Sequence, residues 1–411
     1  MPIPISPLLP KWELQSYSEN IDFDCDDLPE PKIRHQTLIF RNHSCKWHIK
    51  VTVIGTVFGF RSIKKSLPER HHEFKQFALS IDYTSLPLIA DTVTEIEYTL
   101  SNENFNSITV QNETTFADNA FMTSMNMMTC EIKEDAKRVV YPIDGISSSL
   151  RRIKLEQLQD KVQISTAVFK VCFASQTFVY KEINRMGYLP LDTDNILQEI
   201  EALEIFQGCS NIVQAVGIIT STNPYQTDPS SDYPPVITGI LLKFYPMGSL
   251  ELIFEQHEAN KVVCWSSVTI QIGEALICMH KAKRTHLNLK LSNIVLDADG
   301  NALIIDISGT GSFTWEWLAP EMKKELQDRV DDGHEAKPAQ SPFEKQRLND
   351  TWAYGKLLST IAKKLGGNGL GLKANRVAEC LMIEDPKIRM SLENAIEVLR
   401  QEDDGKPVAN I

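Results

Sequence analysis

Apolar and polar residues alternate over much of the first 145 positions of the chain. The alternation is clearest in TLIFRN, KWHIKVTVIGTVFGF, QFALSIDY, TEIEYTLS and NSITVQNETTF, which are also rich in β-branched and aromatic residues. A period of two residues is typical of strands with one buried face. Polar segments such as CDDLPEPK and ERHHE separate these stretches and are expected to be loops. The pattern predicts a β-rich N-terminal domain over residues 1–145.

The pattern changes near residue 150, where short strand-like stretches surround one helical stretch. The expected strands are RRIKLEQLQ, VFKVCFASQ, TFVYKEIN, VQAVGIITS and VITGILLKF, and the loop NPYQTDPSSDYPP separates the last two. The helical stretch, TDNILQEIEALEIFQ, has Thr193 or Asp194 as its expected N-cap. Its apolar face consists of Ile196, Ile200, Leu203 and Phe206. Helical patterns dominate beyond Leu250. We therefore expect an α+β domain over residues 150–405, with a small β-rich lobe (150–244) and a helical lobe (245–405).

Composition and charge narrow the class of protein. The chain has 411 residues, of which 42% are hydrophobic and 23% charged, as in ordinary globular proteins. Its formal net charge of −12 argues against nucleic-acid and anionic-membrane partners, which need clustered Lys and Arg. The eight cysteines contain no C-x-x-C spacing, which favours reduced thiols. The N-terminus does not resemble a signal peptide, and the apolar run VTVIGTVFGF is too short to span a bilayer. We expect a soluble cytoplasmic protein.

The adjacent residues His71, His72 and Glu73 could suggest a metal site. Adjacent residues point in different directions on a strand or a helix, so the three are poorly placed to share one ion. A solvated loop is the favoured interpretation of this segment.

Motifs that can carry chemistry follow one another in the second domain. VYKEI contains Lys181, QEIEAL contains Glu199, and LKFYPMGSL begins at Leu242. The stretch THLNLKLSNIVLDADGNALIIDISG then runs from Thr285 to Gly309, and Ala-Pro-Glu ends at Glu321. LNDTWAYGKLLS and DPKIRMSLENAIEVL follow in the C-terminal part.

These motifs, in this order, resemble the eukaryotic protein-kinase family from about Leu150 to Arg400. The resemblance is greatest to degenerate kinase-like proteins of filamentous fungi. It implies a bilobal fold, ATP and Mg²⁺ as cofactors, and a protein as substrate or partner. The nucleotide-binding positions that it implies are Lys181, Glu199, Lys243 and Tyr245, the last two through backbone groups of a hinge that also includes Phe244. The other positions are Asn288 and Lys290 for catalysis, Asn293 and Asp306 for the metal, and His286, Glu321, Asp350 and Arg389 for structure.

Three departures from the family pattern put phosphoryl transfer in doubt. Asn288 stands where the family carries its catalytic Asp, and an amide cannot accept a proton as a carboxylate does. The hairpin expected to cover the phosphates, LQDKVQISTAVF, has no glycine and so grips phosphate poorly. Only fourteen residues separate Asp306 from Glu321, and the substrate-docking helix of the lower lobe is reduced to LGGNGLG. The polar insert MKKELQDRVDDGHEAKPAQS is expected to be a solvated loop rather than a docking element.

Three functions remain open on the sequence. The leading one is a pseudokinase that binds ATP and acts through protein contacts. The second is an active, atypical Ser/Thr kinase in which Asn288 only orients the substrate. The third is a scaffold that binds no nucleotide and works through its N-terminal β domain.

Overall fold

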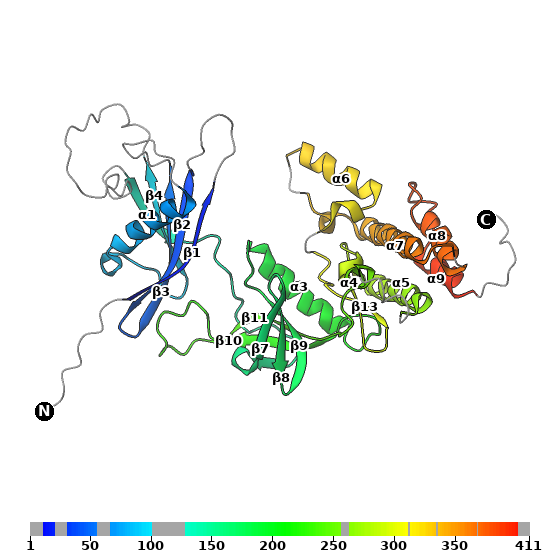
Figure 1. The fold of residues 1–411 in the computed structure, drawn as a ribbon, viewed down its shortest axis with the longest axis horizontal. Coiled ribbons are helices and arrows are strands. Elements are labelled where there is room, and N and C mark those ends of the chain that lie inside the picture. The colour runs from blue at the N-terminus through cyan, green and yellow to red at the C-terminus, as the bar shows by residue number, and fades with distance from the viewer. Residues whose placement is uncertain are drawn as a thin grey trace. The chain divides into compact units, whose positions relative to one another are not determined.

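The computed structural model describes residues 11–20, 31–55, 66–100, 128–255, 263–310, 313–333, 336–367 and 369–401. The chain divides into two compact units (Figure 1). The first consists of residues 1–138 together with 222–235, and the second of residues 139–221 and 236–411.

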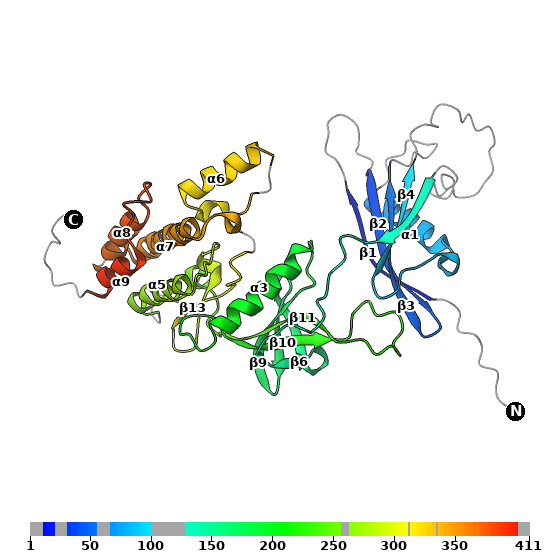
Figure 2. The same cartoon turned by 180° about the vertical axis from the view of Figure 1, so that it is seen from behind.

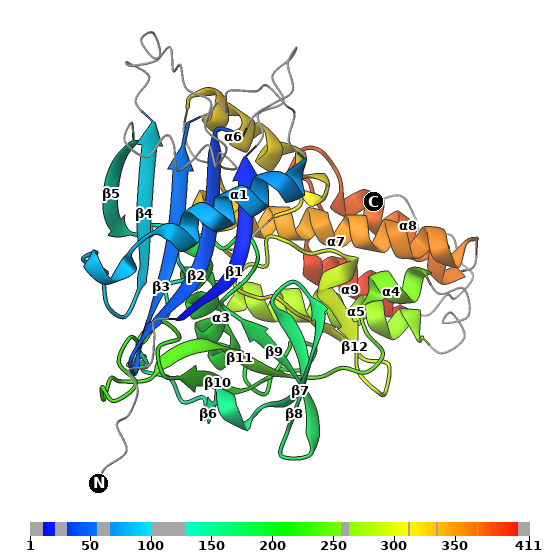
Figure 3. The same ribbon diagram turned by 60° about the vertical axis from the view of Figure 1, so that its left-hand side comes forward.

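A mixed sheet forms the first unit, with its strands in the order β1-β2-β3-β4-β5. The strands are β1 (Lys11–Asn20), β2 (Ile33–Asn42), β3 (Cys45–Ile54), β4 (Val93–Leu100) and β5 (Met128–Glu134). Neighbours pair antiparallel except β3 and β4, which are parallel. A parallel pair needs a crossover connection, and α1 (Leu67–Ser80) is part of it. Figure 3 shows α1 crossing one face of the sheet.

The core of the first unit lies between α1 and that face of the sheet. Phe74 and Phe77 of α1 are fully buried there, against Val51 of β3 and Ile96 of β4. These side chains belong to one cluster that also takes in apolar residues of β2. Burial of aromatic side chains is the main stabilising contribution in a domain of this size.

The strand and loop predicted around α1 are wrong. QFALS belongs to this helix, and ERHHE is helical rather than a loop. Phe74, Phe77 and Ala78 are buried at the three- and four-residue spacing of a helix, which outweighs the short alternating pattern. Glu69 accepts hydrogen bonds from the backbone N–H and the hydroxyl of Ser66, which fixes the start of the helix.

Other predictions for this unit have mixed outcomes. TLIFRN and TEIEYTLS lie in β2 and β4 as predicted, and β3 contains the first part of KWHIKVTVIGTVFGF. NSITVQNETTF lies outside the described residues. Strands β1 and β5 were not predicted, because KWELQSYSEN and MTCEIKE are largely polar and exposed.

The loop at residues 222–235 leaves β10 and returns in β11, yet it packs in the first unit. Thr227 and Asp91 exchange two hydrogen bonds between backbone N–H and side-chain oxygen, each 2.8 Å long. The N–H of Lys46 donates to the carbonyl of Thr227 at 3.0 Å. The ring of Tyr225 meets that of His48 edge-on. The loop thus continues the structure of the first unit.

The small lobe of the second unit is a sheet in the order β6-β10-β11-β9-β8-β7. Its strands are β6 (Arg152–Lys154), β7 (Gln159–Ser165), β8 (Val168–Phe173), β9 (Gln176–Glu182), β10 (Ala215–Ser221) and β11 (Val236–Lys243). Helix α3 (Leu191–Ile205) contacts β10 and β11 (Figure 2). The predicted apolar face of α3 is buried, with Ile196, Ile200, Leu203 and Phe206 at most 6% exposed.

The predicted N-cap of α3 is wrong. The helix begins at Leu191 and its N-cap is Pro190, so Thr193 and Asp194 lie in the first turn. The hydroxyl of Thr193 donates instead to the carbonyl of Val140 at 2.6 Å. A polar side chain can satisfy a tertiary partner as well as a helix end, and the sequence does not show which.

The helical lobe follows β11. Its elements are α4 (Leu250–Glu255), α5 (Trp265–Lys281), β12 (Ile294–Leu296), β13 (Ala302–Ile304), α6 (Pro320–Asp331), α7 (Phe343–Leu365), α8 (Gly369–Leu381) and α9 (Leu392–Arg400). Helix α5 packs against α9, α7 and β13. In the described ranges, no helix combines the length and apolar character that crossing a bilayer requires.

The insert after Glu321 is a helix in its first half, so the loop prediction is wrong there. Helix α6 includes MKKELQDRVD and begins at Pro320, a residue type suited to the first helical position. Met322 and Leu326, four residues apart, are buried in a cluster with Leu318. Two apolar residues in a charged segment are therefore enough to fix a helix when a partner surface covers them.

Candidate functional site

Lys181 on β9 connects two carboxylates that come from distant parts of the chain. Its Nζ lies 2.5 Å from Oε2 of Glu199 on α3 and 2.5 Å from Oδ1 of Asp306, which follows β13. Strand β9 pairs antiparallel with β11, and α3 packs on β11. This arrangement brings Lys181 and Glu199 together. Three groups that the sequence nominated for nucleotide and metal binding thus form one cluster.

The three charged groups of the cluster shift one another's pKa. Burial lowers the pKa of Lys181, but the carboxylates of Asp306 and Glu199 outweigh it and hold that pKa above its ordinary value. Lys181 lowers the pKa of Asp306, which stays ionised. Burial, opposed by Lys181, raises the pKa of Glu199, whose Oε1 is buried without a hydrogen-bond partner. Lys181 is a fixed positive charge and Asp306, 38% exposed, is its accessible partner.

Asp350 on α7 holds the loop that contains Asn288. Its side chain is fully buried and accepts the backbone N–H groups of His286 and Leu287, each at 2.8 Å, and contacts His280 Nε2 at 2.9 Å. A buried carboxylate is tolerated when hydrogen bonds satisfy it in this way. The structure thus brings Asp350 beneath the loop.

His286 fixes the same loop from within. Its Nδ1 accepts the N–H of Asn288 at 3.2 Å, and its Nε2 lies 2.9 Å from the carbonyl of Ile305. His286 therefore joins the loop to the residue before Asp306.

A directional chain of hydrogen bonds ends on Asn288. The ammonium of Lys290, which has no acceptor, donates to Oγ1 of Thr314 at 3.1 Å. The Thr314 hydroxyl then donates to Oδ1 of Asn288 at 3.0 Å. The amide oxygen therefore already accepts one hydrogen bond, and the other polar atom of the Asn288 side chain is an NH₂ group that can only donate.

Asn293 stands beside Asp306 in the fold. Its carbonyl accepts the N–H of Ile305 at 3.0 Å, and its side-chain NH₂ donates to the carbonyl of Asn288 at 2.8 Å. With its NH₂ group used in this way, the side-chain oxygen is the atom left for a cation. Together with the carboxylate of Asp306 it makes a hard oxygen pair of the kind that Mg²⁺ prefers. The residues present therefore fit Mg²⁺ if phosphate oxygens supply further ligands. No cluster of three or more His, Cys, Asp or Glu side chains suited to a metal occurs in the described part of the chain, which includes His71, His72 and Glu73.

The β7–β8 hairpin lies where the resemblance places the phosphate-covering loop. Ser165 pairs with Val168, so the turn consists of Thr166 and Ala167, and Ala167 has a positive φ of 56°. Every residue of β7 is exposed. An alanine in this conformation is strained, whereas glycine would adopt it freely. The prediction of a glycine-free hairpin holds, with one strained residue at its tip.

Backbone groups of two hinge residues make hydrogen bonds to other backbone groups of the chain. The N–H of Lys243 donates to the carbonyl of Gln214 at 3.0 Å, and the carbonyl of Tyr245 accepts the N–H of Gly248 at 3.3 Å. The N–H of Lys243 is therefore already used in this conformation, whereas the carbonyl of Tyr245 keeps a second lone pair. Binding of the base by backbone groups of Lys243 and Tyr245 stays a prediction.

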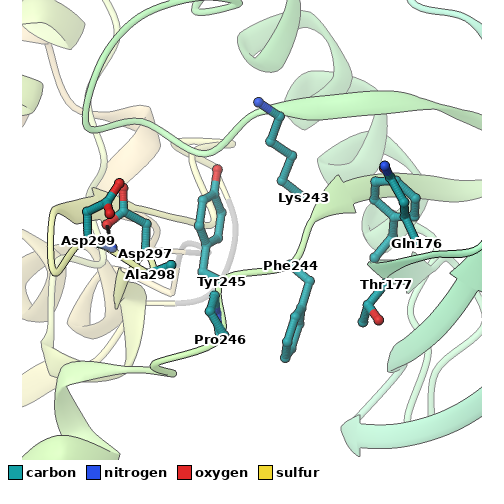
Figure 4. Close-up of a pocket in the computed structure, with 10 residues that line it drawn as sticks. Gln176, Thr177, Lys243, Phe244, Tyr245, Pro246, Asp297, Ala298 and Asp299 are labelled. Atoms are coloured by element: carbon teal, nitrogen blue, oxygen red, sulfur yellow. Dashed lines mark hydrogen bonds between the residues drawn. The ribbon is translucent and has the colours of Figure 1, made fainter.

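Two cavities lie against the hinge. One, of about 350 Å³, extends from the start of β9 at Gln176 and Thr177 past Phe244 and Tyr245 to the acidic turn at Asp297–Asp299 (Figure 4). The other, of about 600 Å³, is bordered by Gly208, Cys209, Gln214, Lys243, Tyr245, Gln271 and Asn301, among others. Neither is lined by Lys181 or Asp306.

Two residues at the site were not nominated from the sequence. The hydroxyl of Thr314 donates to the amide oxygen of Asn288. In the sequence, Thr314 is marked only as a hydroxyl residue in the short segment between Asp306 and Glu321. Gln214 binds the hinge, and nothing in VQAVGIITS distinguished it. The structure also brings Glu321 and Arg389 together as an ion pair of 2.7 Å.

Comparison with known families identifies this arrangement. Residues 165–325 match the family model of the protein kinase domain. No curated protein matches the chain. This region of the chain is therefore a protein kinase domain, and the predicted α+β, bilobal kinase-like fold with a β-rich N-terminal region is confirmed.

Proposed function

We propose that this protein is a pseudokinase: a kinase-like protein that binds ATP with Mg²⁺ and acts through contacts with another protein. The observation that carries this proposal is the state of Asn288. Its amide oxygen accepts the hydroxyl of Thr314, and its NH₂ group can only donate. General-base assistance is typically worth about 10²–10⁴ in rate, and this position offers no base.

Nucleotide binding in this proposal depends on the charges around Lys181. Its ammonium would meet the phosphate oxygens, and Glu199 would hold its orientation. Asp306 and Asn293 would hold Mg²⁺, which neutralises phosphate charge when bound. The ion pair between Lys181 and Asp306 would have to weaken when nucleotide binds, because the phosphate oxygens would compete with Asp306 for the Lys181 ammonium.

Poor grip on the phosphates supports binding without efficient transfer. Phosphoryl transfer relies on positioning and charge stabilisation of a loose transition state. The glycine-free β7–β8 hairpin is exposed along β7 and has a strained residue, Ala167, in its turn. Errors of about 1 Å in placing the reacting groups can cost about 10² in rate.

An active Ser/Thr kinase is the second candidate, and one specific observation favours it. Asp350 and His286 hold the loop at residues 286–290 by hydrogen bonds. The hydroxyl of Thr314 connects Lys290 to Asn288. A loop held in this way would position a substrate hydroxyl. In this candidate, Asn288 orients the hydroxyl by hydrogen bonding while Lys290 and the metal stabilise the transferred group.

A two-part experiment tests the proposal. Thermal unfolding is measured with and without ATP and MgCl₂, and transfer is measured with radiolabelled ATP on a generic protein substrate. Nucleotide at about 100 times its Kd should add about 2.7 kcal/mol of stability, while labelled product should stay at the level of an Asp306→Ala variant. Robust transfer that Asp306→Ala abolishes would establish the active kinase. Absence of any thermal shift would instead favour a scaffold that works through the N-terminal unit.

A further inference from the structure

Two thiols from distant parts of the sequence meet in the second unit. Cys209 lies in the link between α3 and β10, and Cys278 lies on α5, 69 residues later. Their sulfur atoms are 3.8 Å apart, and the Cys278 thiol donates toward Cys209. Both residues are half-buried, so neither is sealed from small solutes.

Gln214 holds the link that presents Cys209. Its side-chain Nε2 lies 2.9–3.3 Å from the carbonyl oxygens of Phe206, Cys209, Ile212 and Val213, which share its two hydrogens. Its Oε1 accepts the N–H of Gly208 at 2.7 Å. One side chain thus organises the whole turn, and Cys209 is kept in a fixed place rather than on a loose loop.

The link between α3 and β10 adjoins the two segments that carry the carboxylates of Glu199 and Asp306. Asn211 accepts the N–H of Ile304, and the N–H of Val213 donates to the carbonyl of Ile304, both at 2.9 Å. Ile304 is two residues before Asp306, while α3, which carries Glu199, ends just before the link. A bond that fixes the link therefore also restricts how Glu199 and Asp306 can move around Lys181.

We propose that Cys209 and Cys278 form a reversible disulfide with a hydroperoxide as the oxidant. Cys209 borders the cavity of about 600 Å³ and meets the oxidant first. Its thiolate attacks the peroxide O–O bond, which gives a sulfenic acid and releases water when the oxidant is hydrogen peroxide. The Cys278 thiolate then attacks that sulfur, the S–S bond forms, and the sulfenic oxygen leaves as a second water. The peroxide is reduced by two electrons and the thiol pair is oxidised by two.

The geometry requires only a small movement. A disulfide has an S–S length of about 2.05 Å, so the sulfurs must close by about 1.8 Å from 3.8 Å. The bond would tie the link to α5 and close a long loop, which removes disorder from the unfolded chain. This inference does not depend on whether the protein binds nucleotide or transfers phosphate.

The test maps disulfides in the full-length chain. Reduced protein is treated with a small excess of hydrogen peroxide, blocked with iodoacetamide, digested without reductant and analysed by mass spectrometry. The expected product is a linked pair of peptides containing Cys209 and Cys278, lighter by two hydrogen atoms and separated by dithiothreitol. The oxidised protein should unfold at a temperature about 5–10 °C higher than the reduced protein.

Variants separate this pair from general thiol oxidation. Cys209→Ser and Cys278→Ser should each lose the linked peptides, and Cys278→Ser should instead leave a sulfenic acid on Cys209 that dimedone captures. A double variant, Cys130→Ser with Cys264→Ser, removes two exposed thiols and should form the link normally. The proposal is overturned if Cys209 and Cys278 are both fully alkylated after oxidation while Cys130 or Cys264 is oxidised. It is also overturned if Cys209 links to other cysteines as often as to Cys278. The map of the unmutated protein decides both points even if a variant does not fold.

Discussion

Arg389 holds Glu321 with both terminal nitrogens of its guanidinium group. Nη1 lies 2.7 Å from Oε1 of Glu321 and Nη2 lies 3.1 Å from Oε2. The Arg389 side chain is fully buried, donates also to the carbonyls of Leu348 and Ile383, and lies over the ring of Trp352. The pair ties the first residues of α6 to the segment before α9. A bidentate pair of this kind, with a buried arginine and a half-buried glutamate, fixes geometry as well as contributing stability.

Arg389→Leu should destabilise the second unit by about 3–5 kcal/mol. The substitution leaves the Glu321 carboxylate and two backbone carbonyls without their donor, and an uncompensated buried charge is costly. Urea unfolding followed by tryptophan fluorescence measures the effect. Arg400→Leu is the matched control, because the Arg400–Glu274 pair is exposed and should be worth at most about 1 kcal/mol. An unchanged urea midpoint for Arg389→Leu would contradict the assigned role.

Lys181→Met should weaken binding of ATP with Mg²⁺ and leave the fold intact. A hydrogen bond to a charged group is worth about 1.5–3 kcal/mol, so the Kd should rise about 10- to 150-fold. Isothermal titration calorimetry measures the Kd, and circular dichroism checks the fold. Lys154→Met serves as the control because the Lys154 side chain is 74% exposed. Equal affinities for the two variants would argue against a nucleotide site at Lys181.

Asn288→Asp should raise phosphoryl transfer by far less than the 10²–10⁴ that a missing general base accounts for. Asn and Asp have nearly the same shape, so the hydrogen bond from Thr314 can persist while the second oxygen becomes an acceptor. The β7–β8 hairpin still places the phosphates poorly in this variant. Incorporation of radiolabelled phosphate, compared between the wild type and Asn288→Asp, measures the gain. A rise of 10³ or more would mean that the base was the only deficit.

The first unit should lose stability as the pH falls from about 6.5 toward 4. Burial, helped by the charge of Lys46, lowers the pKa of His48 to about 4, and its Nε2 is buried without a hydrogen-bond partner. The unfolded chain therefore binds a proton in this range that the folded chain excludes, so protonation favours unfolding. Melting temperatures measured across this range should fall less steeply for His48→Gln than for the wild type. His71→Gln, which changes an exposed ring, should retain the wild-type slope.

Elements with long apolar patterns, and motifs that occur in a fixed order, could be predicted from the sequence. The strands β8 to β11 and the helix α3 were predicted because their apolar residues recur at the spacing of a strand or a helix. The kinase resemblance rested on motifs whose order does not depend on distant contacts. Asn288 could be identified as the replaced residue for the same reason, since its neighbours in the loop are intact.

Only the tertiary structure decided features that depend on a partner far along the chain. QFALS became helical because Phe74 and Phe77 are covered by the sheet, and the charged insert became α6 because Met322 and Leu326 are covered. Local pattern does not reveal which surface will cover a short apolar pair, and burial outweighs the weak intrinsic preference of the segment.

The chemistry of the site divides in the same way. The sequence determined that Asn288 cannot act as a carboxylate, because that property belongs to the residue itself. It did not determine that Thr314 occupies the amide oxygen, that Gln214 engages the hinge, or that Cys209 meets Cys278. Hydrogen bonds and thiol contacts require atoms to approach within a few ångströms, and the chain reaches those distances only when it is folded.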